Sequence, residues 1–145
     1  MRFSRQNKDA KVRLLSRVSL FSGCSRGELG RIASLVDQLE VPKGKVLASE
    51  GDPGWEFFVV CEGQAKATKR GRKVASLGQG SFFGEMSLLD EGPRSATVTA
   101  ETDMQLLVLN SRSFSALIAE NPSVSRKLLR GLAERLRGAE PDPTH

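Results

Sequence analysis

Groups that enzymes use for nucleophilic and acid–base chemistry are scarce in this sequence. It contains a single histidine, His145 at its last position, and no tyrosine. A Ser–His or Cys–His nucleophile system needs a histidine held inside the fold. No acidic or cysteine residues have the spacing of metal ligands either. We therefore expect no catalytic residue, no metal site and no cofactor, and we predict that the protein is not an enzyme.

Long apolar runs are absent too, the longest being short segments such as Phe57–Cys61 and Leu106–Leu109. A membrane-spanning helix needs about 20 apolar residues, so no membrane span is expected. The basic N-terminus is not followed by the apolar core of a signal peptide. The two cysteines, Cys24 and Cys61, lie far apart in the sequence, as is usual in a reducing compartment. These absences predict a cytoplasmic protein.

The net charge is +5, and the excess of positive over negative charge lies at the two ends of the chain. Residues 1–17 carry six basic side chains against one acidic, whereas residues 18–121 carry 11 basic against 13 acidic. Residues 122–145 carry five basic against three acidic. The middle of the chain is therefore mildly acidic, and a basic arm usually forms a solvated face. Non-specific contact of the arms with nucleic acid stays open as an alternative.

Helical patterns lie at both ends of the chain. A first helix is predicted to begin near Asp9, and a second after Ser25, because Ser25 and Glu28 have the spacing of a capping box. Near the C-terminus, Ser113–Glu120 predicts a short helix. Pro122 suits the first turn of a final helix that runs to about Arg137. An apolar stripe along that helix comprises Leu128, Leu129, Leu132, Ala133 and Leu136.

Between these helices the sequence has the rhythm of short strands and turns that is typical of sandwiches and rolls. The candidate strands are Glu56–Cys61, Gln64–Lys69, Lys73–Leu77, Ser95–Ala100 and Met104–Asn110. Candidate turns lie at Asp52-Pro53-Gly54, Glu62-Gly63 and Arg70-Gly71, the first fitting a type II turn with Gly54 in the positive-φ position. The pattern predicts an α+β protein in which strands dominate.

One segment, Gly78–Val98, interrupts the strand rhythm. Glycines lead into a short helix-compatible piece, Glu85–Leu89, whose first N–H groups would attract an anion. Arg94 follows at a distance that lets the chain turn back toward this point, and an arginine can hold a phosphate through two parallel N–H bonds. Glu85 would accept hydrogen bonds from sugar hydroxyls. The residues themselves thus indicate an anion site with one sugar acceptor.

The same segment resembles the phosphate-binding cassette of the cyclic nucleotide-binding domain family, which includes catabolite-activator regulators and regulatory subunits of cAMP-dependent protein kinase. The resemblance rests on Phe83-Gly84-Glu85-Met86-Ser87-Leu88-Leu89 and Pro93-Arg94-Ser95-Ala96-Thr97-Val98, and it extends over roughly residues 11–138. It implies an eight-stranded, jelly-roll-like β-roll flanked by N-terminal helices and a C-terminal lid helix. Residues 1–10 would form a flexible basic arm and residues 139–145 a flexible tail.

The resemblance also implies roles for individual residues. Arg94 would pair with the cyclic phosphate, Glu85 would bind the ribose 2′-hydroxyl, and the Gly84 backbone would approach the sugar. Further expected contacts are backbone N–H groups around Met86, Ser87 and Ala96, the hydroxyl of Ser95, and a wall against the base formed by Val74, Leu77, Phe83 and Met86. The implied ligand is cAMP, with cGMP as the alternative.

The expected function is that of a sensor module in which the ligand moves the lid helix and an unknown protein effector reads the change. Specific DNA binding is not expected, because only Ala139–His145 follow the lid and leave no room for a helix-turn-helix domain. Two alternatives stay open. In the first, the domain is degenerate and used only for protein contacts. In the second, its basic arms make it a weak DNA-binding regulator.

Overall fold

A computed structural model of the protein describes residues 2–4, 8–84 and 92–139. Its helices are α1 (Lys8–Ser16), the short 3₁₀ helix η1 (Ser19–Phe21), α2 (Arg26–Ala33), α4 (Ser111–Glu120) and α5 (Pro122–Ala139). Its strands are β1 (Arg2–Ser4), β2 (Asp37–Val41), β3 (Val46–Ala48), β4 (Glu56–Glu62), β5 (Ala65–Lys69), β6 (Arg72–Leu77), β7 (Phe82–Phe83), β8 (Thr97–Ala100) and β9 (Met104–Asn110).

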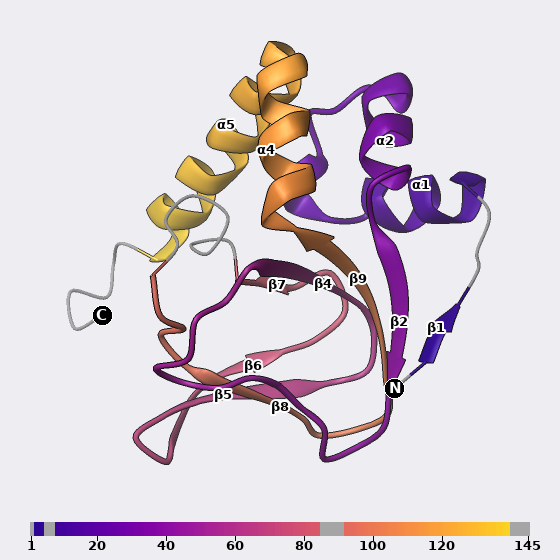
Figure 1. Ribbon diagram of the computed structural model, residues 1–145. Coiled ribbons are helices and arrows are strands. Elements are labelled where there is room, and N and C mark those ends of the chain that lie inside the picture. Colours follow the sequence, from indigo (N-terminus) through magenta and orange to yellow (C-terminus); the bar gives the residue numbers. More distant parts are fainter. Residues whose placement is uncertain (1, 5–7, 85–91, 140–145) are drawn as a thin grey trace.

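The strands form two antiparallel sheets that face one another below a layer of helices (Figure 1). One sheet has the order β1-β2-β9-β4-β7 and the other the order β3-β8-β5-β6. Strands β2 to β9 therefore make up the predicted eight-stranded roll, and the α+β fold class is confirmed. Strand β1 comes from the basic arm, where we expected a flexible segment, and pairs with β2 through Phe3↔Leu39.

Strand β4 of the first sheet is buried on both faces, which explains its unbroken apolar run. Phe57 and Val59 point into a core that this sheet shares with the helices. Phe58 and Val60 point into a second core between the two sheets. Successive strand side chains lie on opposite faces, so a strand that is covered on both sides is apolar at every position.

The helical layer is joined across its elements by Glu28. Ser25 and Glu28 form the predicted capping box of α2, with the Ser25 N–H donating to Glu28 Oε1 at 2.7 Å. The Glu28 carboxylate also accepts hydrogen bonds from Ser123 Oγ and Lys127 Nζ of α5, each at 2.5 Å. These three hydrogen bonds hold the pKa of Glu28 at about 2, below its ordinary 4.5. The first turns of α5 are therefore fixed to α2.

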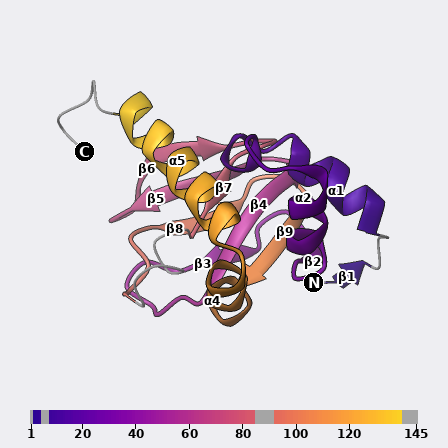
Figure 2. The ribbon, with the colours of Figure 1, turned by 90° about the horizontal axis from the view of Figure 1, so that it is seen from above.

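Farther along α5, a glycine lets the helix lie directly on η1. A Cβ at Gly131 would be 2.8 Å from the carbonyl oxygen of Leu20, closer than real Cβ contacts come. Beyond this point α5 continues across the molecule toward the side on which β6 lies, as the view from above shows (Figure 2). None of the helices within the described ranges has the length and apolar character that crossing a membrane requires.

Within the described residues, the predicted strands and helices lie where the sequence places them, except for small shifts at their ends. The expected turn at Asp52-Pro53-Gly54 is wrong: the turn lies three residues earlier in the chain. The positive φ belongs to Gly51, at 87°, and the Asp52 N–H closes the turn on the Ser49 carbonyl at 3.1 Å. Pro53 instead forms an antiparallel bridge with Pro93, which keeps the chain extended at this point. Gly63 and Gly71 have the positive φ expected of their turns.

Candidate functional site

The backbone of Arg94 is fastened to the turn that precedes β4. Its N–H donates to the Asp52 carbonyl at 2.7 Å, and its own carbonyl accepts from the Gly51 N–H at 2.9 Å. The Pro53–Pro93 bridge is the next pair along the chain, beside the hydrogen bond between Arg94 and Asp52. Backbone contacts with a segment about 40 positions earlier in the chain thus fix the position from which the Arg94 side chain extends.

The guanidinium group of Arg94 lies against two glycines that come from different segments. A Cβ on Gly54 would overlap Nε of Arg94. A Cβ on Gly84 would lie 2.6 Å from Nη1 of Arg94 and 2.5 Å from the carbonyl oxygen of Glu56. Gly84 also has a φ of 86°, a conformation that residues with a side chain rarely adopt. Both positions therefore require glycine if the guanidinium is to keep its place.

Aromatic rings form the floor beneath Arg94. Its guanidinium carbon lies 5.9 Å from the centre of the Phe58 ring, within the range of a cation–π contact. Phe58 in turn stacks on Phe83, with ring centres 4.8 Å apart and planes tilted by 14°. This pair belongs to the core between the two sheets, so the position of the cation depends on the packing of that core.

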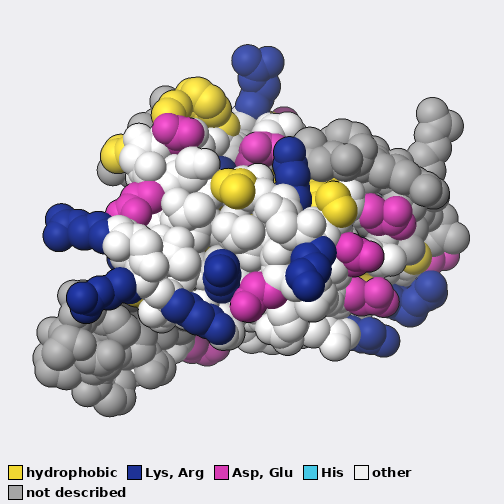
Figure 3. Space-filling view, turned by 90° about the horizontal axis from the view of Figure 1, so that it is seen from below, with side chains coloured by type: hydrophobic (Ala, Val, Ile, Leu, Met, Phe, Trp, Pro, Cys, Tyr) yellow, Lys and Arg dark blue, Asp and Glu magenta, His cyan; other side chains and the backbone are white. Residues whose placement is uncertain are grey.

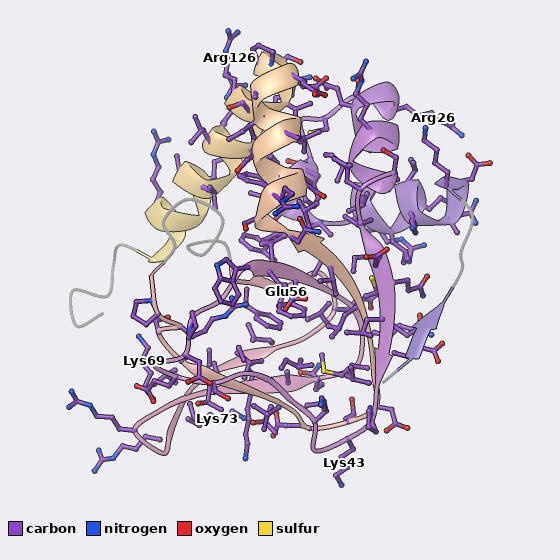
Figure 4. The ribbon with its side chains drawn as sticks, viewed as in Figure 1. Arg26, Lys43, Glu56, Lys69, Lys73 and Arg126 are labelled. Carbon is purple, nitrogen blue, oxygen red and sulfur yellow. The ribbon has the colours of Figure 1, made fainter. Side chains whose placement is uncertain are left out.

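Burial and a neighbouring carboxylate shift the pKa of Arg94 in opposite directions. Burial lowers the pKa of its guanidinium, while the charge of Glu56 raises it. An arginine remains protonated under either influence. In Figure 4 the exposed Glu56 lies at a level between the helices and the lower sheet, whereas Lys43, Lys69 and Lys73 lie at the lower end. The site thus contains a half-buried permanent cation, which suits an anionic ligand.

A cavity of about 260 Å³ lies beside Arg94. Its described lining comes from β3, from the turn before β4 and from Arg94 itself: Val46, Leu47, Ala48, Ser49, Asp52, Pro53, Gly54, Trp55, Glu56 and Arg94. A larger hollow of about 700 Å³ lies between the β6–β7 segment and α5, with Leu77, Phe82 and Gly131 among its lining residues. In residues 2–4, 8–84 and 92–139, no cluster of three or more His, Cys, Asp or Glu residues could hold a metal ion.

The structure brings some of the predicted site residues together. Phe83, Gly84 and Arg94 meet as described above. Ala96 packs partly buried against the core between the sheets. Ser95 is exposed. Three further predicted residues, Glu85, Met86 and Ser87, lie outside the described residues, as does the predicted helical piece Glu85–Leu89.

Two residues expected to wall the base lie on β6, the edge strand of the second sheet. Leu77 is buried in the core between the sheets. Val74 is 54% exposed and lies where the pairing of β5 with β6 shifts register, since Ala67 pairs with Ala75 but Thr68 pairs with Lys73. The extra residue at this bulge leaves Val74 on the surface. Its contact with a base stays a prediction.

Three residues of the site were not predicted from the sequence: Gly54 as a close neighbour of the guanidinium, Trp55 at the rim of the cavity, and Glu56 as the nearby charge. Gly54 was expected to serve a turn instead. No sequence signal singles these residues out, because their importance arises from the Pro53–Pro93 bridge, which joins two distant segments.

Comparison with known proteins supplies the family. The profile of the cyclic nucleotide-binding domain matches residues 38–121, more than half of the chain. The chain belongs to the cyclic nucleotide-binding domain family. Among curated proteins, it is 38% identical over 126 residues to the cyclic AMP receptor protein of Thermus thermophilus, which aligns with 83% of this chain and 58% of that protein. It is 35% identical over 115 residues to a cAMP-dependent protein kinase regulatory subunit of Aspergillus niger, covering 78% of this chain and 28% of that protein.

Solved structures of this family share the fold. The N-terminal domain of a transcriptional regulator from Streptomyces coelicolor superposes with a TM-score of 0.76 at 33% identity, covering 88% of this chain and 92% of that one. The regulatory domain of Toxoplasma gondii protein kinase A, solved with cAMP, has a TM-score of 0.76 at 28% identity, covering 88% of this chain and 50% of that one.

The chain spans little more than half of the bacterial regulators it matches, and less than a third of the kinase subunit. These relatives are regulatory proteins by name. The segment shared with them includes the roll and the surroundings of Arg94, so it is this domain, and not the rest of the relatives, that the comparisons describe.

Proposed function

We propose that this chain binds a cyclic nucleotide, with cAMP preferred over cGMP, and acts as a sensor without catalytic activity. The observation that carries the proposal is the position of Arg94, whose guanidinium group lies between Gly54 and Gly84 above the Phe58 ring. A half-buried cation held by glycine backbone suits a phosphate that must approach closely. The family membership and a cAMP-bound relative of the same fold support cAMP as the ligand.

In this proposal the cyclic phosphate pairs with Arg94 and the sugar lies against Gly84. Glu85, by its resemblance to the cassette glutamate of the family, accepts a hydrogen bond from the ribose 2′-hydroxyl. Backbone N–H groups around Met86, Ser87 and Ala96 complete the phosphate contacts, and the Ser95 hydroxyl lies close enough in sequence to join them. The base then faces Val74, Leu77, Phe83 and Met86.

Helix α5 is the proposed lid. Its first turns are fixed to α2 by Glu28, while its later part borders the hollow of about 700 Å³ above β6 and β7. A ligand shifts the position of this part only if it binds the closed arrangement better than the open one. We propose that contacts between the base and the leucine stripe of α5 supply that difference, and that a protein effector reads the result.

Specific DNA binding by the described domain is not part of the proposal. On the face seen in Figure 3, Lys and Arg side chains alternate with Asp and Glu side chains, so this face offers no continuous positive surface. Proteins that bind DNA through its phosphates need clustered cations.

Calorimetric titration with cAMP, cGMP and 5′-AMP tests the proposed function. We expect both cyclic nucleotides to bind, cAMP more tightly, and 5′-AMP to bind at least about tenfold more weakly than cAMP because its open phosphate carries more charge and a different shape. If neither cAMP nor cGMP binds, the proposal is wrong, and a degenerate domain used for protein contacts is favoured.

A further inference from the structure

Exposed large apolar side chains are few on the described surface. They are Val46, Trp55, Val74 and Leu129, with exposed fractions of 47, 53, 54 and 58%. Two of these four, Val46 and Trp55, line the same small cavity as Arg94. Apolar side chains that gather at one exposed place mark binding sites more often than isolated ones do. The edge of this cavity is therefore a candidate binding site.

Trp55 is held at the rim by its neighbours in the chain. Gly54, which precedes it, lies against the Arg94 guanidinium. Glu56, which follows it, is the first residue of β4, and its charge raises the pKa of Arg94. The Trp55 carbonyl accepts a hydrogen bond from the Ser111 N–H at the start of α4, at 2.7 Å. The backbone of Trp55 is thus fixed between the cation and the helical layer.

We propose that Trp55 contacts the phosphate and sugar of the bound nucleotide and closes this cavity over them. The inference rests on the proposed function and adds a residue to it. Burial of the indole ring on the ligand removes apolar surface from water. It also excludes water from the pair of Arg94 and phosphate, which attract each other more strongly in a less polar surrounding.

The size of the cavity favours this occupant over a docked protein segment. Its volume of about 260 Å³ lies just below the roughly 300–1,000 Å³ of pockets that hold a whole drug-sized ligand. The space therefore suits part of a nucleotide, namely the cyclic phosphate with its ribose. Arg94 is the one basic residue of the described lining, which also contains the acidic residues Asp52 and Glu56. Pairing with Arg94 places the anionic end of the ligand here and leaves the base to the hollow beneath α5.

Fluorescence tests this inference directly, because Trp55 is the single tryptophan and the chain has no tyrosine. With cAMP added to the full chain, we expect the emission to shift to shorter wavelength and acrylamide quenching to fall, with the same midpoint as the calorimetric titration. Adenosine, which lacks the phosphate, should leave the emission unchanged at equal concentration. Unchanged emission at a cAMP concentration that calorimetry shows to be saturating would overturn the inference while leaving the proposed function intact.

Two variants complete the test by calorimetry. We expect Trp55→Ala to bind cAMP about tenfold more weakly, as the loss of part of an aromatic contact predicts, and Trp55→Phe to stay within about threefold of the original chain. Circular dichroism of both variants confirms that they are folded. If folded Trp55→Ala binds cAMP as tightly as the original chain, Trp55 makes no contact of importance and the inference is wrong. If the original chain binds no cyclic nucleotide, the proposed function and the inference are both wrong.

Discussion

Gly84 and Arg94 lie so close together that the glycine has no room for a side chain. A Cβ on Gly84 would come within 2.6 Å of Nη1 of Arg94. Gly54 confines the same guanidinium from another segment. Both glycines restrict the direction of the Arg94 side chain. In the proposed function, the ligand therefore does not have to order a long, flexible side chain.

Gly54→Ala is the cleanest test of this preorganisation, because Gly54, unlike Gly84, does not have a positive φ. The added methyl group should displace the Arg94 guanidinium and weaken cAMP binding at least about tenfold, with a loss of stability of about 1–3 kcal/mol from overpacking. Calorimetry and chemical denaturation measure the two effects. Gly27→Ala is the matched control, because a Cβ at Gly27 meets nothing within 4 Å. Equal affinities of the two variants would show that Gly54 does not position the cation.

Gly131→Ala should destabilise the protein, although alanine is the better helix former by about 1 kcal/mol. The reason is the contact with Leu20, whose carbonyl oxygen would lie 2.8 Å from the new Cβ. We expect a net loss of about 1–2 kcal/mol in the free energy of unfolding, measured by urea denaturation. The same change at Gly27 in α2 should leave stability equal or higher. A gain in stability at Gly131 would mean that α5 does not lie directly on η1.

The hydrogen bonds that Glu28 accepts predict that the stability of the protein depends on pH. The pKa of Glu28 is lowered to about 2 by hydrogen bonds from Lys127, Ser123 and Ser25, in that order. A carboxyl group with a depressed pKa stabilises the folded state above its ordinary value of 4.5, and this contribution is lost as the pH falls toward 2. Melting temperatures of the original chain and of Glu28→Gln should therefore differ at pH 6 and converge as the pH falls from 5 to 2. A difference that does not change with pH would contradict this role.

Much of the fold follows from local sequence signals. The capping box of Ser25 and Glu28, the Arg70-Gly71 turn and the apolar run of β4 each specify their own structure through short-range rules. Strands β1, β2, β3 and β7 were not predicted as separate elements. Strand β3 has only three residues, and its pairing with β8 shifts register between Val46 and Ala48, so it depends on its partner more than on its own pattern.

The site was predictable only in part. The cassette motif indicates Arg94 and Gly84, because the resemblance to the family rests on these residue types at this spacing. The motif does not reveal that Gly54 and Trp55 join them, since those residues come near through the bridge between Pro53 and Pro93. The meeting of Glu28 with Lys127 is likewise a contact across 99 positions that no local pattern encodes.

The titration of Arg94→Leu with cAMP, run beside the original chain, tests the central claim most directly. Breaking a buried charged pair costs about 3–5 kcal/mol, and partial exposure of Arg94 lessens this, so we predict a loss of affinity of at least about 30-fold. Arg94→Lys should also bind more weakly, because an ammonium group cannot form two parallel hydrogen bonds with a phosphate. If folded Arg94→Leu binds cAMP as tightly as the original chain, Arg94 does not hold the phosphate and the account of the site is wrong.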